Sequence, residues 1–158
     1  MDTNPRRLNI GSGWFPLDGW TNVDEHCPAD IQGDFRELEF HGVDEILLSH
    51  LLEHLSWRET IPILVQMRGW LRSGGRLTVE VPDMEAIMQM GTDFHDWVRY
   101  VYGSQQNEGE YHRAGFTADS LVTLLESAGY EEVTARQFRS EFRTRPGMPC
   151  VEAIAYAP

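Results

Sequence analysis

Short apolar runs separated by polar segments predict a series of buried strands over the first part of the chain. Arg7–Ile10 has a Leu-x-Ile pattern and is followed at once by Gly11-Ser12-Gly13, as in a buried strand that ends in a tight turn. Asn22–Asp24 predicts a second short strand. Residues 14–21, which lie between them, contain a proline and a glycine and are too few for an ordinary crossover helix. Asp30–Phe35 fits either a third strand or an extended loop.

The central part of the chain predicts two longer strands. Asp44–Ser49 carries a continuous apolar run, Ile46-Leu47-Leu48, which is typical of a strand covered on both faces. Arg76–Val81 alternates between apolar and polar residues and stops at Pro82-Asp83.

A helix is predicted between these two strands, with two alternative starts. Ser56 could open a capping box, but Pro62 would then remove a hydrogen bond inside the helix. With Thr60 as the N-cap, Pro62 falls in the first turn, where proline is tolerated. In either case Leu64, Met67 and Leu71 share one face, and Gly74-Gly75 is expected to end the helix.

The last third of the chain predicts two helices and a pair of closing strands. Asp93 is a candidate N-cap for a helix through Tyr102, and Thr117 is the candidate N-cap of a helix that Gly129 ends. Glu132–Phe138 and Val151–Tyr156 are predicted strands with only an Arg- and Pro-rich loop between them, so they should pair antiparallel.

Alternating strands and helices predict an α/β fold in which a mostly parallel sheet of seven strands carries helices on both faces and has an antiparallel last strand. The sequence contains no repeat, low-complexity tract or linker. Residues 1–158 are therefore expected to form a single domain.

Composition narrows the classes of partner. The 13 basic and 25 acidic residues give a formal net charge of −12, which repels phosphate backbones and anionic lipid. We therefore expect a small-molecule substrate and neither nucleic acid nor membrane as a partner. Two isolated cysteines, Cys27 and Cys150, do not form a disulfide framework. The N-terminal residues are polar, and no run reaches the ~18 apolar residues of a membrane helix, which favours a cytoplasmic protein.

Polar residues and glycines follow three of the predicted strands. In open parallel sheets, ligands bind at the carboxyl ends of the strands where the strand order reverses. The turn Gly11-Ser12-Gly13, the strand end Asp24 and the pair Ser49-His50 should therefore lie close together. The glycines let a ligand approach the backbone, and an aspartate that ends the second strand can accept both hydroxyls of a ribose. This spacing indicates a ligand that contains a nucleoside.

The same motifs resemble those of the class I S-adenosylmethionine-dependent methyltransferases, and are most similar to a small subgroup with a shortened first crossover helix. The resemblance spans about residues 7–138 and implies a doubly wound, Rossmann-like sheet with S-adenosylmethionine as cofactor. The motifs that carry it are Leu8–Gly13 with Gly19–Asp24, Asp44–Leu55, Leu71–Leu77, and His112–Thr117 with the helix that follows.

Cofactor-binding residues follow from the resemblance. It implies that Gly11, Ser12 and Gly13 lie along the methionine and ribose portions, and that Asp24 binds the ribose hydroxyls. It further implies a position beside adenine for Asp34 and Phe35, and a position beside the methionine moiety and the methyl group for Ser49 and His50.

The chain departs from the family pattern at three places. Asn9 stands where many members have an acidic residue, and Ser73 replaces the usual proline. A helical extension before the first strand is missing from the sequence, so a site without an N-terminal lid is expected.

The resemblance implies methyl transfer to a small polar acceptor through an oxygen or nitrogen nucleophile. His50, His112 and Asp83 are the candidate general bases, because each is expected at the carboxyl edge of the sheet. The alternative is a non-catalytic subunit of the same fold that binds S-adenosylmethionine or acts as a scaffold. The compact chain, with residues 84–116 as its only long excursion, fits that alternative too.

Residues 84–116 combine aromatic and polar side chains and are predicted to form a substrate lid with His112 closest to the chemistry. The same segment could instead cover the edge of the sheet or make the contact of a homodimer.

A competing motif directly follows the predicted strand Asp44–Ser49. His50-Leu51-Leu52-Glu53-His54 matches the H-x-x-E-H pattern of zinc peptidases, and two histidines four apart share one helical face. A zinc site needs a third protein ligand, and no sequence pattern indicates which residue would supply it. The sequence alone therefore predicts no metal site, and a structural role is expected for His54.

Overall fold

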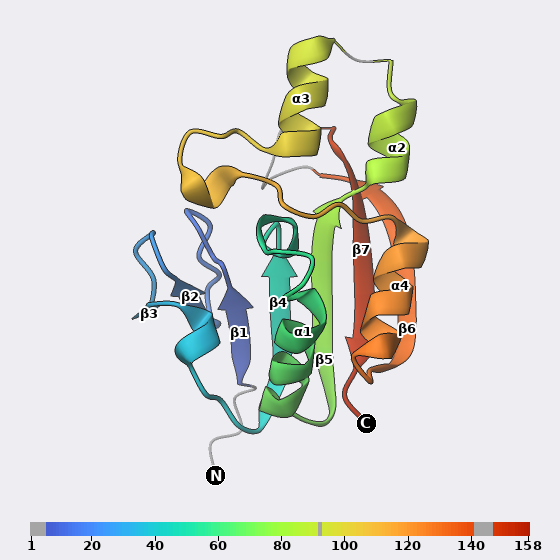
Figure 1. Cartoon of the computed structure of the whole chain (residues 1–158). Helices are drawn as coiled ribbons and strands as arrows, with labels where there is room; N and C mark the ends of the chain where they lie inside the picture. The colour runs from blue at the N-terminus through green and yellow to red at the C-terminus, as the bar shows by residue number, and fades with distance from the viewer. Residues whose placement is uncertain (1–5, 92, 141–146) are drawn as a thin grey trace.

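A seven-stranded sheet organises the molecule (Figure 1). The computed structural model describes residues 6–91, 93–140 and 147–158; the polar N-terminal residues 1–5 and most of the loop of the last hairpin lie outside this range. The strand order is β3-β2-β1-β4-β5-β7-β6. The strands are β1 (Arg7–Ile10), β2 (Thr21–Asp24), β3 (Ile31–Gln32), β4 (Val43–Ser49), β5 (Leu71–Pro82), β6 (Glu131–Arg139) and β7 (Pro149–Tyr156).

The pairing confirms the predicted doubly wound, mostly parallel, Rossmann-like sheet. Strands β1 to β5 pair in parallel, and β7 is antiparallel to both β5 and β6. The chain moves outward from β1 through β2 to β3, then returns to place β4 on the other side of β1. The strand order therefore reverses between β1 and β4, and the loops that follow these two strands meet at one edge of the sheet.

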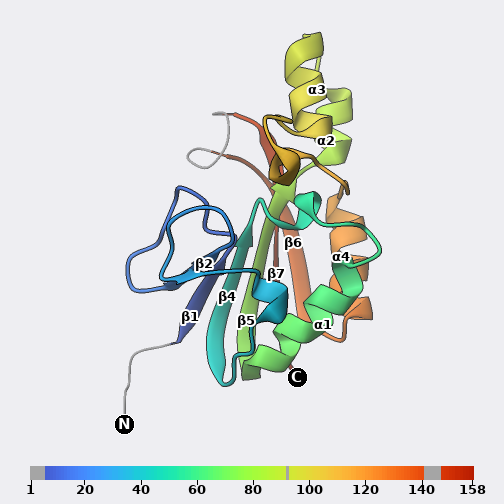
Figure 2. The ribbon, with the colours of Figure 1, turned by 60° about the vertical axis from the view of Figure 1, so that its left-hand side comes forward.

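Two helices, α1 (Thr60–Trp70) and α4 (Ala118–Ser127), lie on the same face of the sheet (Figure 2). They also touch each other: the hydroxyl of Tyr130, just after α4, donates to the carbonyl of Leu64 at 3.0 Å, and the Arg68 guanidinium donates to the carbonyl of Gly129 at 3.0 Å. Helices were expected on both faces. In the described part of the chain, neither of these helices covers the second face.

The second face of the sheet carries charged and half-buried side chains. The ion pairs Arg76–Glu45, at 3.1 Å, and Arg136–Glu152, at 2.6 Å, link neighbouring strands there. The cause is visible in the connections: residues 11–20, between β1 and β2, form turns and no helix. The sequence predicted that this connection is too short for a crossover helix. The second face therefore lacks the helix that would otherwise join β1 to β2.

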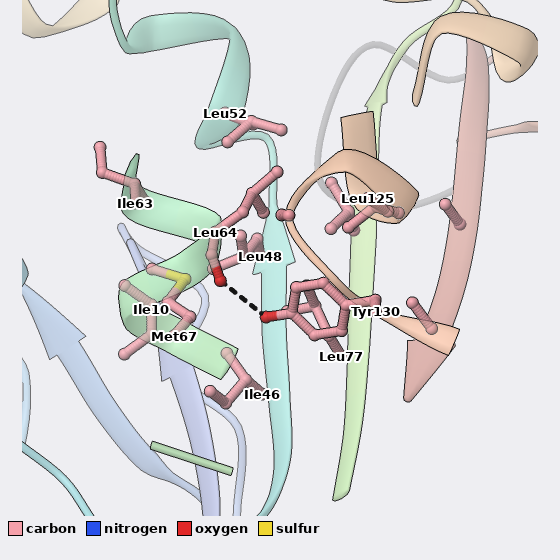
Figure 3. Packing of buried hydrophobic residues seen from close by; sticks show 14 of the residues in the cluster. Ile10, Ile46, Leu48, Leu52, Ile63, Leu64, Met67, Leu77, Leu125 and Tyr130 are labelled. Atoms are coloured by element: carbon pink, nitrogen blue, oxygen red, sulfur yellow. Dashed lines mark hydrogen bonds between the residues drawn. The ribbon is translucent and has the colours of Figure 1, made fainter. Parts of the chain in front are cut away.

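The main hydrophobic core fills the space between the sheet and the two helices (Figure 3). Every second residue of the central strands faces it, because side chains alternate between the two faces of a strand. A fully buried leucine or isoleucine contributes about 1.5–3 kcal/mol relative to an exposed one. Figure 3 labels the contributors Ile10, Ile46, Leu48, Leu52, Ile63, Leu64, Met67, Leu77, Leu125 and Tyr130.

Both ends of α1 differ from the prediction. Thr60 is its first residue and Glu59 occupies the N-cap position, although Pro62 does fall in the first turn. The helix ends at Trp70, and Gly74-Gly75 belongs to β5. A side chain at Gly75 would place its Cβ 2.9 Å from the carbonyl oxygen of Val43. The glycine therefore permits close pairing of β4 and β5 and does not terminate the helix.

The predicted N-caps of the two later helices are confirmed. Asp93 caps α3 (Phe94–Tyr102), and Thr117 forms a capping box with Ser120 at the start of α4. An unpredicted helix, α2 (Met84–Gln89), follows β5 directly. α2 and α3 stand beyond the carboxyl end of β5 (Figure 1), around a second hydrophobic cluster of Ile87, Tyr100, Met148 and Cys150. No helix in the described residues is long and apolar enough to cross a membrane.

Candidate functional site

A cavity of about 980 Å³ lies at the carboxyl ends of β1, β2 and β4. The segment from Arg99 to Arg113, which runs from the end of α3 through the short helix η3 (Glu108–Glu110), forms its other wall. This volume is at the upper end of the range for small-molecule sites. Of the predicted site residues, Gly11, Gly13, Asp24, Phe35, His50 and His112 line it.

The glycine turn is held by its own amides. The backbone N–H groups of Gly11 and Ser12 donate to the carbonyl of Val23, at 2.8 and 3.1 Å, and that of Gly13 donates to the Asp24 carboxylate at 2.7 Å. Gly13 has a φ of +54° and nothing within 4 Å of the position a Cβ would take. The turn thus offers a ligand an open backbone surface, while its amides stay bonded within the protein.

Asp24 organises the loops around the cavity. One carboxylate oxygen accepts from Gly13, and the other accepts from the N–H groups of His26 and Cys27, at 2.9 and 2.7 Å. Both oxygens are therefore aimed at the carboxyl edge of β1 and β2. One oxygen receives a single bond and keeps a lone pair for a hydroxyl donor.

Of the two residues predicted to lie beside adenine, Phe35 lines the cavity and Asp34 does not. Phe35 is buried and lines the cavity in the short helix η1 (Phe35–Glu37). Asp34 caps that helix outside the cavity lining, and the Arg36 side chain donates to both of its carboxylate oxygens at 2.8 and 2.9 Å. This bond lowers the pKa of the Asp34 carboxyl below its usual value. Arg36, which the sequence did not single out, reaches the cavity instead.

Besides Asp34, three more predicted site residues lie outside the cavity lining: Ser12, Ser49 and Asp83. Ser12 and Ser49 are buried, and the Ser49 hydroxyl donates to Glu80 at 2.5 Å. Asp83 is fully buried as the N-cap of α2: one oxygen accepts from the N–H groups of Glu85 and Ala86, and the other from the Gln137 amide at 2.6 Å. Its two oxygens therefore hold a helix start and a neighbouring strand, and Asp83 is absent from the cavity lining.

His50 lines the cavity with both ring nitrogens engaged. Its Nδ1 lies 3.1 Å from Glu53 Oε1, and its Nε2 lies 3.9 Å from the sulfur of Cys150. Burial raises the pKa of the Cys150 thiol to about 12, so it stays protonated and can donate to His50. His50 also has a φ of +54°, which is strained for a residue other than glycine. Its position is fixed, and it has no free nitrogen for a substrate.

His112 and His54 are in contact with each other on the wall of the cavity. Their ring centroids are 4.9 Å apart in an edge-to-face arrangement, and both rings line the cavity. Burial lowers the pKa of His112 below its usual value. The sequence pointed to His112 but gave His54 a structural role, and it did not single out Glu53. The H-x-x-E-H spacing was the available signal for both.

The cavity lining is rich in charge of both signs. It contains five carboxylates, Asp24, Glu25, Glu53, Glu108 and Glu110, and three guanidinium groups, Arg36, Arg99 and Arg113. A zwitterionic or cationic ligand suits such a lining better than a polyanion does.

The fold is similar to that of solved methyltransferases. An S-adenosylmethionine-dependent methyltransferase from Archaeoglobus fulgidus matches with a TM-score of 0.67 and 15% identity, over 98% of this chain and 86% of that one. The 1,6-didemethyltoxoflavin-N1-methyltransferase of Burkholderia thailandensis, solved with S-adenosylhomocysteine and 1,6-didemethyltoxoflavin, matches at 0.68 and 20% identity, over 98% and 72%. An S-adenosylmethionine-dependent methyltransferase from Methanosarcina mazei matches at 0.67 and 16% identity, over 99% and 93%.

These similarities define the class of fold. No protein-family model matches the sequence, and no curated protein matches it significantly. At 15–20% identity the solved structures establish the fold alone. The chain has the fold of the S-adenosylmethionine-dependent methyltransferases, as its four motifs predicted.

Proposed function

We propose that the protein transfers a methyl group from S-adenosylmethionine to a small polar acceptor. The observation that carries this proposal is the cavity at the reversal point of the strand order, where Gly11, Gly13 and Asp24 meet. The similar fold of the Burkholderia thailandensis enzyme, which binds S-adenosylhomocysteine, supports it.

The residues present fit this cofactor. Gly13 leaves open space for a ligand against the backbone, Asp24 can accept from ribose hydroxyls, and Phe35 offers an aromatic face for adenine. The carboxylates of the lining complement the positive charge of a sulfonium. When bound, S-adenosylmethionine supplies an electrophilic methyl group, so the main tasks of the protein are to align the acceptor and exclude water.

The acceptor side of the site is formed by residues 99–113, which we propose as the working part of the predicted lid. Tyr100 and His112 come from this segment and line the cavity. Since Asp83 caps a helix and His50 has both nitrogens engaged, His112 is the candidate base best placed to meet the nucleophile. The acceptor is inferred to be small, since cofactor and acceptor share about 980 Å³.

Calorimetry of the whole chain tests the proposal. S-adenosylmethionine and S-adenosylhomocysteine should bind with micromolar affinity, ~7–8 kcal/mol, and raise the melting temperature. Methyl transfer to a mixed panel of small amines, hydroxyls and carboxylates should then yield S-adenosylhomocysteine. Absence of heat and of a thermal shift with both compounds would overturn the proposal, whereas binding without turnover on any acceptor would favour the non-catalytic alternative.

Asp24→Ala should weaken binding of S-adenosylmethionine by about 1.5–3 kcal/mol, since hydrogen bonds from ribose to a charged group are lost. The change also frees three backbone N–H groups of the surrounding loops. Asp30→Ala is the matched control. The Asp30 carboxylate accepts from Asn22, which lies on β2 together with Asp24, but Asp30 does not line the cavity. Equal affinities for the two variants would show that Asp24 has no part in binding.

A further inference from the structure

One cluster of side chains in the cavity offers more than contact with an acceptor. Glu53, His54 and His112 each present a candidate ligand atom, and these three atoms lie within 4.8 Å of one another. Metal bonds of about 2.0–2.2 Å put neighbouring ligand atoms about 3–4 Å apart, so a small rotation of the side chains would close them around an ion. Two of these residues, Glu53 and His54, belong to the H-x-x-E-H motif, and His112 joins them from elsewhere in the chain; His50, the first histidine of the motif, is not one of the three.

The third ligand comes from a distant part of the chain that is firmly attached. The N–H groups of Arg113 and Ala114 donate to the backbone carbonyl of Glu53 at 2.7 and 3.1 Å. The N–H of His112 donates to the carbonyl of Tyr102 at 3.1 Å, in the last turn of α3. These bonds hold His112 between α3 and the short helix η2 (Leu52–His54).

Both histidines are oriented as metal ligands usually are. Nδ1 of His112 lies 3.0 Å from the carbonyl oxygen of Tyr100, and Nδ1 of His54 lies 3.2 Å from that of Tyr111. A carbonyl can only accept, so each Nδ1 carries the proton. In the neutral ring each Nε2 then has a free lone pair. Metal-binding histidines commonly donate their other N–H to a backbone carbonyl in this way.

Glu53 supplies a buried oxygen without a partner. Its side chain is 2% exposed, Oε1 meets His50, and Oε2 has no hydrogen-bond partner. A buried carboxylate oxygen left without a partner is costly, by about 1–3 kcal/mol or more for a charged group. A cation at this point would remove that cost.

We propose that Glu53, His54 and His112 bind a first-row divalent transition-metal ion inside the cavity. Two imidazole nitrogens and one carboxylate suit Mn²⁺, Co²⁺ or Zn²⁺, whereas Mg²⁺ and Ca²⁺ prefer sites made of oxygen ligands. Three protein ligands leave coordination positions open toward the cavity for water or another small ligand. His50 acts as a positioning residue, because its bond to Glu53 Oε1 leaves Oε2 free for the ion.

The site also narrows the choice of acceptor, a step that rests on the proposed function. A bound metal ion lowers the pKa of a coordinated hydroxyl group and fixes its position. A hydroxyl acceptor would then be held at the ion, release its proton to water in the cavity and take the methyl group on its oxygen, leaving S-adenosylhomocysteine, so that no separate protein base is required. His112 would serve as a ligand of the ion in that case.

Metal binding by the whole chain, without cofactor or acceptor, tests the site. After treatment with a chelator, Co²⁺ should bind with a stoichiometry of one and produce visible absorption bands, and calorimetry should show Zn²⁺ and Mn²⁺ binding more tightly than Mg²⁺. His54→Ala should weaken Co²⁺ binding by more than about 100-fold, since loss of a ligand exceeds the 10–100-fold effect of losing a partner behind one.

Two further variants complete the test. Glu53→Gln keeps the shape of the buried side chain and should also fail to bind the ion. If the Glu53→Gln protein does not fold, the test rests on His54→Ala, because His54 is only half-buried and its loss disturbs the fold less. His95→Ala is the control, since His95 is an exposed histidine on α3 outside the cavity lining and should leave Co²⁺ binding unchanged. Co²⁺ affinity that is the same in His54→Ala as in the unchanged protein would overturn the site. Calorimetry with S-adenosylmethionine is a separate measurement, so failure of the metal site and failure of the proposed function are distinguishable.

Discussion

Gly13→Val is expected to reduce S-adenosylmethionine binding by more than about 100-fold, roughly 3 kcal/mol, with the sheet intact. Gly13 lines the cavity, and the space its Cβ would enter is empty of protein atoms to 4 Å. A branched side chain there would occupy the volume that we assign to the cofactor. Calorimetry with S-adenosylmethionine measures the loss, and circular dichroism reports the fold.

Gly42→Val is the matched control for backbone strain. Gly42 has a φ of +64°, close to the +54° of Gly13, and it too has nothing within 4 Å of a new Cβ, but it lies outside the cavity lining. Both variants carry the cost of a branched residue in the left-handed region. Gly11→Val is less informative, since its Cβ would lie 2.9 Å from the Leu51 side chain and disturb packing as well. Retention of full affinity in Gly13→Val would place the ligand elsewhere.

His112→Ala should lower the rate of methyl transfer by about 10²-fold with little change in affinity for S-adenosylmethionine. The ring lines the cavity from the segment that we propose as the acceptor side, and its Nδ1 is the nitrogen bonded to Tyr100, which leaves Nε2 for the nucleophile. The lower transfer rate is expected whether His112 accepts a proton or holds a metal ion, because in both cases His112 acts on the nucleophile. Single-turnover rates and calorimetry separate the chemical step from cofactor binding.

His95→Ala serves again as the comparison for the rate, since it removes an imidazole of the same lid region outside the cavity lining. The His112 variant also loses a bond to the carbonyl of Tyr100, so its melting temperature should be compared with that of the control. A full transfer rate in His112→Ala would exclude the residue from the chemistry.

The sequence predicted the fold well where the signal was local. Buried strands follow from short apolar runs, and Thr117 and Gly129 bound α4 because capping depends on a few neighbouring residues. α2 was missed because six residues are too few to show helical periodicity, and its cap, Asp83, was interpreted as a base. The glycines at 74 and 75 were assigned to a helix end because close strand pairing leaves no mark in the local sequence.

The sequence could predict those residues of the candidate site that lie at the ends of strands, but not those that a long loop brings to it. Parallel strands place Gly13, Asp24 and His50 at one edge, and the structure has all three on the cavity. Ser12, in the turn after β1, and Ser49, the last residue of β4, are buried outside the cavity lining although they stand beside residues that line it. The meeting of Glu53 with His112 depends on the course of a long loop, which has no periodic signal.

Among the described residues neither α1 nor α4 lies on the second face of the sheet, and this affects how the molecule responds to temperature. Exposure of apolar surface raises the heat capacity on unfolding, by about 0.45 cal/mol/K for each Å², and exposure of polar surface lowers it. A sheet with its two main helices on one face buries one apolar layer where a sheet covered on both sides buries two. The heat-capacity change per residue should therefore fall below the usual ~12–15 cal/mol/K, so that the stability curve of this protein is flatter than those of three-layer α/β proteins of the same length.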